Sequence, residues 1–201
     1  ERYKRLSGLH FLQIAIVLRE LHHAIGIPCN RADDDGNFDI GVYQESGPNK
    51  GCYDTTEEVL TRLIRSYNMA ITTKGVNETV ATLRDICEKK RACTDKDLVA
   101  VNNGIYDYGH KILMGFDPEL VFLTKSHIDF VDSAKNPVIH NDEDGTDWDV
   151  VSWMDELSDD PEIVKLLWQI IGAVIRPNVS WNKSAWFYST LGNNGKGTLC
   201  V

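Results

Sequence analysis

The sequence predicts an α+β fold, mostly helical with small β-hairpins, followed by the first strand and loop of a separate α/β domain. Three observations lead to this prediction. Apolar residues recur at helical spacing in several segments that begin at capping residues and end near Gly or Pro. Between them, short runs rich in β-branched and aromatic residues flank turn residues. Finally, an apolar run over residues 185–191, typical of a central parallel strand, leads directly into a glycine-rich loop.

The first helix is expected from Ser7, which can act as its N-cap, to Gly26, with Pro28 as a stop signal. Its apolar side chains cover a wide face, so we expect the helix to be substantially buried. His22 and His23 lie near its end. Because no second ligand pair stands at the spacing that one helix face requires, we interpret both histidines as surface or capping residues instead of metal ligands.

Two short strands are expected within residues 37–55, around a Ser-Gly-Pro-Asn-Lys-Gly turn. Thr55 and Glu58 then have the spacing of a capping box, in which each side chain bonds to the backbone N–H of the other residue. Apolar residues at helical spacing follow, which predicts a second helix. A third helix is expected from Asn77 onward.

The pattern changes to strands from Leu98 onward. Asn103-Gly104 stands between two apolar runs, which is a strong signal of a β-hairpin. Residues 121–130 are expected to supply a third strand.

Helical periodicity returns in the next part of the chain. Thr146 is expected to cap a helix that carries Trp148. Asp160, with Pro161 at the first helical position, starts another helix that ends at Arg176-Pro177. Because the link between the two is short, we expect them to pack as a hairpin of helices.

Negative charge is concentrated in one stretch of the chain, whose net charge is −9. Residues 142–162 hold ten acidic residues and no Lys or Arg, whereas the rest of the chain has 21 basic and 20 acidic residues. A nucleic-acid-binding surface should be basic. The nearest candidate, Lys89–Arg91, is interpreted as favourable positive charge at a helix C-terminus and not as a DNA contact.

Cysteine usage and hydropathy predict a cytoplasmic protein without a membrane span. The five cysteines are irregularly spaced, with no Cys-x-x-Cys pair, which indicates reduced thiols. The longest apolar run, residues 11–25, is interrupted by Gln13, Arg19 and Glu20. The first residue is Glu1 and no signal-peptide pattern follows, so we expect a piece of a longer polypeptide.

The glycine-rich loop has the chemistry of a phosphate-binding loop. Glycines let backbone N–H groups turn toward phosphate oxygens, and a lysine reaches the terminal phosphates. Lys196 is that lysine and the candidate catalytic residue, and Thr198 is the candidate Mg²⁺ ligand. The predicted nucleotide-binding residues are Gly192, Asn193, Asn194, Gly195, Lys196, Gly197 and Thr198.

Two positions depart from the usual pattern of such loops. Thr190 stands where a glycine is usual, and Gly197 separates Lys196 from Thr198. A Lys-Gly-Thr sequence also occurs in nucleotide kinases, so a kinase-like phosphotransferase is one alternative. A non-catalytic oligomerisation or interaction module is another.

The order of several segments resembles the phage and plasmid primase-helicases, in the region that precedes and enters their superfamily 3 helicase domain, and the related poxvirus primase-helicase. The resemblance is carried by "FDIGVYQ", "LVAVNNGIYDY", "FLTKSHIDF", "DDPEIVKLLWQIIGAVIRP" and "KSAWFYSTLGNNGKGT". It implies a collar that helps to assemble a hexamer around DNA, followed by an AAA+ ATPase whose Walker A loop contains Asn194-Gly195-Lys196. It also implies ATP and Mg²⁺ as cofactors and DNA unwinding during replication, with a primase domain commonly upstream.

The resemblance implies three parts: a helical subdomain with a small hairpin (1–95), a subdomain with a β-hairpin and a helical pair (96–180), and the start of the AAA+ domain (185–201). The first two parts together form the collar. The sequence after the loop supplies no Walker B acid pair, polar sensor or arginine finger, and phosphoryl transfer needs these groups together. We therefore do not expect this chain alone to hydrolyse ATP.

Overall fold

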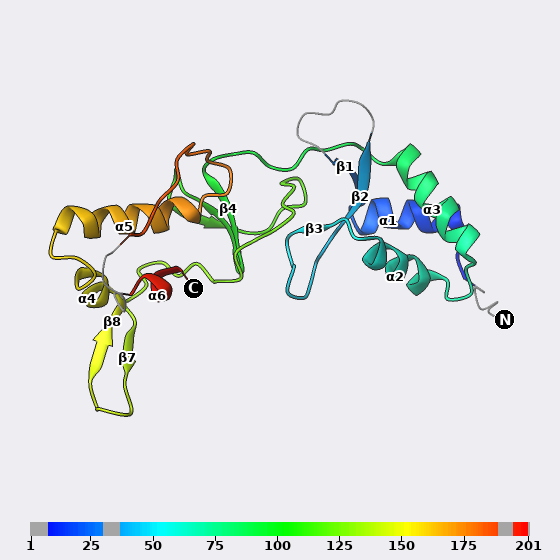
Figure 1. The fold of residues 1–201 in the computed structure, drawn as a ribbon. Helices are drawn as coiled ribbons and strands as arrows, with labels where there is room; N and C mark the ends of the chain where they lie inside the picture. The colour runs from blue at the N-terminus through cyan, green and yellow to red at the C-terminus, as the bar shows by residue number, and fades with distance from the viewer. Residues whose placement is uncertain (1–7, 30–36, 189–194, 201) are drawn as a thin grey trace. The chain divides into compact units, whose positions relative to one another are not determined.

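The computed structural model describes residues 8–29, 37–188 and 195–200 (Figure 1). The chain forms two compact units, one extending to Phe130 and the other beginning at Val131. Each unit combines helices with small antiparallel sheets, which confirms the α+β prediction. Within the described ranges, no helix is long and apolar enough to cross a bilayer. The three-part functional division at residues 95 and 180 stays a prediction.

The first half of unit 1 is a three-stranded antiparallel sheet with three helices. Its elements are α1 (Phe11–Leu21), β1 (Ile25–Pro28), β2 (Phe38–Tyr43), β3 (Tyr53–Asp54), α2 (Glu57–Tyr67) and α3 (Thr73–Ile86). β2 is the central strand, pairing Gly41 with Ile25 of β1 and Val42 with Asp54 of β3. The two strands expected within residues 37–55 are therefore confirmed as β2 and β3.

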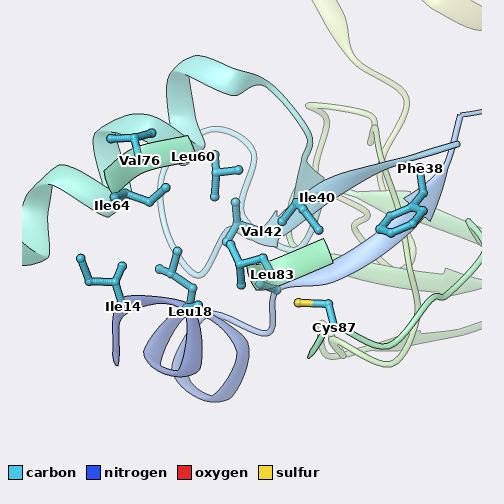
Figure 2. Close-up of a cluster of buried hydrophobic side chains, with 12 residues drawn as sticks. Ile14, Leu18, Phe38, Ile40, Val42, Leu60, Ile64, Val76, Leu83 and Cys87 are labelled. Carbon is cyan, nitrogen blue, oxygen red and sulfur yellow. The ribbon is translucent and has the colours of Figure 1, made fainter. Parts of the chain in front are cut away.

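The side chains of β2 divide between two cores, because successive residues of a strand point to opposite faces. Ile40 and Val42 join the apolar faces of α1, α2 and α3 in the larger core (Figure 2). Its fully buried large side chains are Ile14, Leu18, Val42, Ile64 and Leu83. On the opposite face, Tyr43 joins a smaller core with Ile25, Ile27, Tyr53 and Val121. β2 thus contributes to both cores.

The second half of unit 1 is an antiparallel sheet of β4 (Leu98–Val101), β5 (Gly104–Asp107) and β6 (Ile112–Met114). The predicted hairpin is confirmed, but its turn lies one residue earlier than the Asn103-Gly104 pair: Val101 pairs with Gly104, so Asn102 and Asn103 form the turn. Ile105 is fully buried in a third core, together with Cys52, Ala100 and Phe122.

The strand expected over residues 121–130 is wrong, and the third strand of this sheet is β6. The backbone of residues 121–130 makes hydrogen bonds to several separate segments and forms no continuous β-ladder with one strand. The carbonyl of Val121 accepts from the N–H of Cys93, and that of Phe122 accepts from the N–H of Tyr53, each at 2.7 Å. Farther along, the carbonyl of Ile128 accepts from Asn102. This segment therefore ties the two sheets of unit 1 together without joining either as a strand.

The expectation that the first helix continues to Gly26 is wrong. The helix ends at Leu21, His22 is its C-cap, and His23 has a φ of 47°, the left-handed conformation in which many helices end. The following Ile-Gly-Ile-Pro segment pairs with β2 instead. The predicted capping position of His22 is confirmed, because its backbone N–H donates to the carbonyl of Leu18 as the C-cap. Its side chain is half-buried, with Nε2 2.7 Å from the hydroxyl oxygen of Tyr67. The predicted N-cap at Ser7 is also wrong, because the helix starts at Phe11 with His10 as its N-cap; Ser7 itself lies outside the described residues.

The starts of the next two helices also differ from the prediction. The capping box of Thr55 and Glu58 is wrong, because α2 has Thr56 as its N-cap and the carboxylate of Asp54 accepts from the N–H and hydroxyl of Thr56 at 2.8 and 2.6 Å. α3 begins at Thr73, about one turn before Asn77. Its N-cap Thr72 accepts from the N–H of Gly75 at 3.1 Å.

Unit 2 contains β7 (Val138–His140), β8 (Asp147–Asp149), α4 (Val150–Asp155), α5 (Pro161–Val174) and α6 (Lys196–Cys200). The predicted start of α5 is confirmed, because Asp160 is its N-cap and accepts from the N–H of Glu162 at 2.9 Å. The predicted cap at Thr146 is wrong. Asp149 caps α4, and Trp148 belongs to β8, which pairs with β7 in a hairpin that sequence patterning missed.

Truncation of Leu83 should destabilise unit 1 strongly. Leu83 is 0% exposed at the centre of the larger core, so Leu83→Ala leaves a cavity and should lower the free energy of unfolding by about 2–5 kcal/mol. Leu21→Ala is the matched control, because Leu21 is 62% exposed at the end of α1. Urea unfolding followed by circular dichroism measures both. Equal effects of the two variants would contradict the core assignment.

Candidate functional site

The described part of the predicted phosphate loop begins at Gly195. Gly195 has a φ of 76°, and α6 begins directly after it at Lys196. Gly197 and Thr198 lie within this short helix and are exposed. The predicted residues Gly192, Asn193 and Asn194 lie outside the described residues. The four described residues therefore have the local order of a glycine turn followed by a helix that starts with the lysine.

Gly195 is restricted in two independent ways. Its positive φ strains any residue with a Cβ atom. A Cβ at this position would also stand 2.5 Å from Cδ2 of Leu157 and 3.4 Å from Cζ2 of Trp153. Trp153 lies within α4 and Leu157 follows Glu156, the C-cap of this helix, so the end of the α4 region lies beside Gly195. The backbone conformation therefore favours glycine here, and a side chain would also require the end of the Leu157 side chain to move.

The backbone after Gly195 is held by a helical hydrogen bond. The N–H of Leu199 donates to the carbonyl of Gly195 at 2.9 Å. This bond closes the turn that contains Lys196, so the position of the Lys196 backbone follows from that of Gly195.

A hollow of about 620 Å³ lies beside Lys196 within unit 2. Its walls come from α5, including Ile163 and Leu166, and from the segment of residues 184–188. Gly195, Lys196 and Leu199 line it as well. This volume lies in the range of small-molecule sites, which are mostly apolar with a few polar groups. The hollow could take the apolar part of a ligand whose anionic part reaches Lys196.

We expected a buried strand over residues 185–191, but the described part of this segment, residues 185–188, forms no strand. Residues 185–188 have no regular secondary structure, and Trp186 and Tyr188 are 89% and 86% exposed. A central strand needs partners on both edges, and among the described residues of unit 2 the only strands, β7 and β8, pair with each other. Residues 189–191 lie outside the described part of the chain.

The helix that approaches the loop is held at its start by Asp149. The backbone N–H and hydroxyl of Ser152 donate to its carboxylate at 2.9 and 2.7 Å, and the amide of Asn136 donates to it as well. These donors, with the N–H of Ser152 as the largest influence, lower the pKa of Asp149 to about 2. Farther along α4, Met154 is 1% exposed. Asp149 and Met154 thus hold the helix that carries Trp153.

No cluster of acidic, histidine or cysteine side chains in the described ranges could hold a metal ion by itself. Mg²⁺ commonly keeps several waters and binds a few protein oxygens together with phosphate oxygens. The exposed hydroxyl of Thr198 fits such a shared site, because the phosphates would supply the remaining ligands. Its role as an Mg²⁺ ligand stays a prediction.

The cysteines, all of which lie within the described residues, form no disulfide. This agrees with the expectation of reduced thiols. Burial raises the pKa of Cys87 to about 11 and also raises that of Cys52, so both thiols stay protonated at neutral pH. Since the thiolate is the reactive form, these two residues have a structural role.

The approach of Leu157 and Trp153 to Gly195 was not foreseen in the sequence. Their apolar character and helical spacing indicate burial and nothing about the partner. The contact joins residues about forty positions apart in the chain. Only the tertiary structure identifies Gly195 as the neighbour.

No model of a known protein family matches this sequence, and no curated protein matches it significantly. Function is therefore inferred from the motif, the described geometry and the resemblance of the segments named above.

The carboxylate of Asp149 should make the stability of unit 2 depend on acidity. Its folded pKa of about 2 lies below the unfolded value of about 4, so its stabilising contribution is present above about pH 4 and is lost as the pH falls toward 2. Carbon NMR of the carboxylate should give the low pKa directly. In thermal unfolding, Asp149→Asn should make the loss of stability between pH 4 and pH 2 smaller. Asp155→Asn makes the same charge change elsewhere on α4 and should leave this loss as large as in the wild type. A normal pKa for Asp149 would contradict the capping geometry.

Proposed function

We propose that this chain supplies the collar and the Walker A loop of an ATP-dependent DNA helicase of the phage and plasmid primase-helicase type, acting in DNA replication. The observation that carries the proposal is the placement of Lys196 at the start of a helix, directly after a glycine turn with a φ of 76°. Phosphate loops of nucleotide-binding proteins use this order of turn, lysine and helix. The resemblance of segments before the loop supports the same class.

Each loop residue has a separate role in this proposal. Lys196 compensates the negative charge of the β- and γ-phosphates of ATP, and the backbone N–H groups of Gly192 to Gly195 surround the phosphate oxygens. Thr198 binds Mg²⁺. The chemistry is phosphoryl transfer to water, for which the acidic and arginine groups lie outside these residues.

DNA binding and self-association belong to the assembled protein in this proposal. The collar helps to form a hexamer, and DNA passes through the assembly. A single copy has a net charge of −9, and its excess of acidic over basic residues is concentrated over residues 142–162, so it lacks the overall positive charge of a DNA-binding surface. We propose that this acidic stretch faces solvent, as charged stretches usually do.

Substitution of Lys196 should separate nucleotide chemistry from folding. In the complete protein, Lys196→Ala should reduce ATPase and unwinding activity by about a hundredfold or more, because it removes the charge that compensates the phosphates. Steady-state ATP hydrolysis and strand displacement measure the two activities. The exposed Lys183 offers a matched control, since Lys183→Ala makes the same charge change in the same unit.

A well-folded Lys196→Ala protein that retains most of its ATPase activity would contradict the Walker A assignment. The alternatives give other results. A nucleotide kinase would transfer the phosphoryl group to a second nucleotide without unwinding DNA. A non-catalytic module would associate with itself or a partner and show no ATP hydrolysis in the complete protein.

A further inference from the structure

We propose that residues 126–130 form a strap that covers the edge of β4 and opens as one unit, and that the side chain of Asn103 is the latch that keeps it closed. The strap lies within unit 1, so its role is independent of the proposed nucleotide site. Opening it would expose the edge of β4. It would also lengthen the irregular connection that leads from Phe122 to β7 in unit 2.

The first step is the cover that the strap gives to β4. This strand stands at the end of the order β4-β5-β6 and pairs with β5 on one side. On its other side, the N–H of Ser126 donates to the carbonyl of Ala100 at 2.9 Å. The N–H of Asn102, directly after the strand, donates to the carbonyl of Ile128 at 3.1 Å. Because an unpaired strand edge invites pairing with another chain, proteins commonly cover such edges with a loop.

The second step is the latch at the end of the strap. The Asn103 side chain donates from Nδ2 to the carbonyl of Phe130 at 2.8 Å and accepts at Oδ1 from the N–H of Phe130 at 2.9 Å. One side chain thus satisfies both backbone groups of a residue, as a neighbouring strand would. The ring of Phe130 also stacks on Tyr106 of β5, with ring centroids 4.1 Å apart. Beside it, the Asn102 amide donates to the carboxylate of Asp129 at 2.8 Å.

The third step is the contrast in burial between the strap and the residues before it. Val121 and Phe122 are 3% and 6% exposed, so they anchor the chain in the cores of unit 1. Within the strap, Ile128 is 75% exposed. After it, residues 131–137 are all exposed and belong to no helix or strand. Segments with little buried apolar area open locally, so hydrogen bonds and one stacked ring decide whether the strap stays closed.

Hydrogen exchange of individual backbone amides, followed by NMR, measures the opening of the strap. In the wild type, the N–H groups of Asn102, Ser126 and Phe130 should show the same protection, because one opening event releases all three. Asn103→Ala removes both side-chain hydrogen bonds to Phe130. It should therefore speed exchange at Asn102 and Ser126 by about tenfold or more, although neither N–H bonds to Asn103 itself. Exchange at Asn102 reports directly on the covered edge of β4.

Three comparisons make the test specific. Asn77→Ala, the same change at an exposed position of α3, should leave exchange in the strap unchanged. The N–H groups of Cys93 and Tyr53, which donate to the buried residues before the strap, should keep their wild-type exchange rates in Asn103→Ala. Phe130→Leu removes the stacked ring but keeps both backbone hydrogen bonds, so it should speed exchange in the strap by a smaller factor than Asn103→Ala.

Unchanged exchange at Asn102 and Ser126 in a folded Asn103→Ala protein would overturn the latch. Unequal protection of the three strap amides in the wild type would overturn the opening as one unit. Equally faster exchange at Cys93 would overturn the strap itself, because the whole segment from residue 121 would then open. If Asn103→Ala does not fold, Asn103→Asp provides the test. It keeps the acceptor for the N–H of Phe130 and loses only the donor, so it should speed exchange by a smaller factor.

Discussion

The burial of β2 on both faces is the constraint on which unit 1 depends. Ile40 and Val42 pack against three helices, whereas Tyr43 packs on the opposite face with Val121, a residue far away in the chain. Because side chains alternate along a strand, a shift of one residue would exchange the two sets and break both cores. The positions of the helices and of the segment around Val121 therefore follow from the register of one strand.

Unit 2 differs from unit 1: its described part has a smaller core and hydrogen-bonded caps at its helix starts. Asp149 and Asp160 each accept backbone N–H groups, while few side chains are fully buried. α5 exposes large apolar side chains on more than one side, including Leu166 and Val174. A helix with apolar residues all around is usually covered. Hydrogen-bonded caps therefore hold the starts of α4 and α5 although few described side chains around them are buried.

This difference bears on function. A phosphate site depends on the position of a few backbone groups, and small shifts have large effects on charge compensation. In unit 2 the side chains of Leu157 and Trp153 lie beside Gly195, the residue that precedes Lys196. The packing beside Gly195 therefore lies next to the lysine of the proposed nucleotide site.

The sequence by itself determined the helices and turns whose signals are local. Asp160 with Pro161 specified the start of α5, because a cap depends only on neighbouring residues. The Asn-Gly pair between two apolar runs indicated the β4–β5 hairpin, but the turn itself is one residue earlier, at Asn102-Asn103. It also determined Lys196 as the candidate phosphate-binding residue. Tertiary structure decided what depended on distant partners. Residues 25–28 became β1 because β2 offered hydrogen bonds that outweighed continuation of the helix, and residues 121–130 stayed irregular because their backbone bonds were divided among several segments. The contact of Leu157 with Gly195 was likewise decided only by the fold, since apolar periodicity predicts burial but does not identify the residue that will be covered.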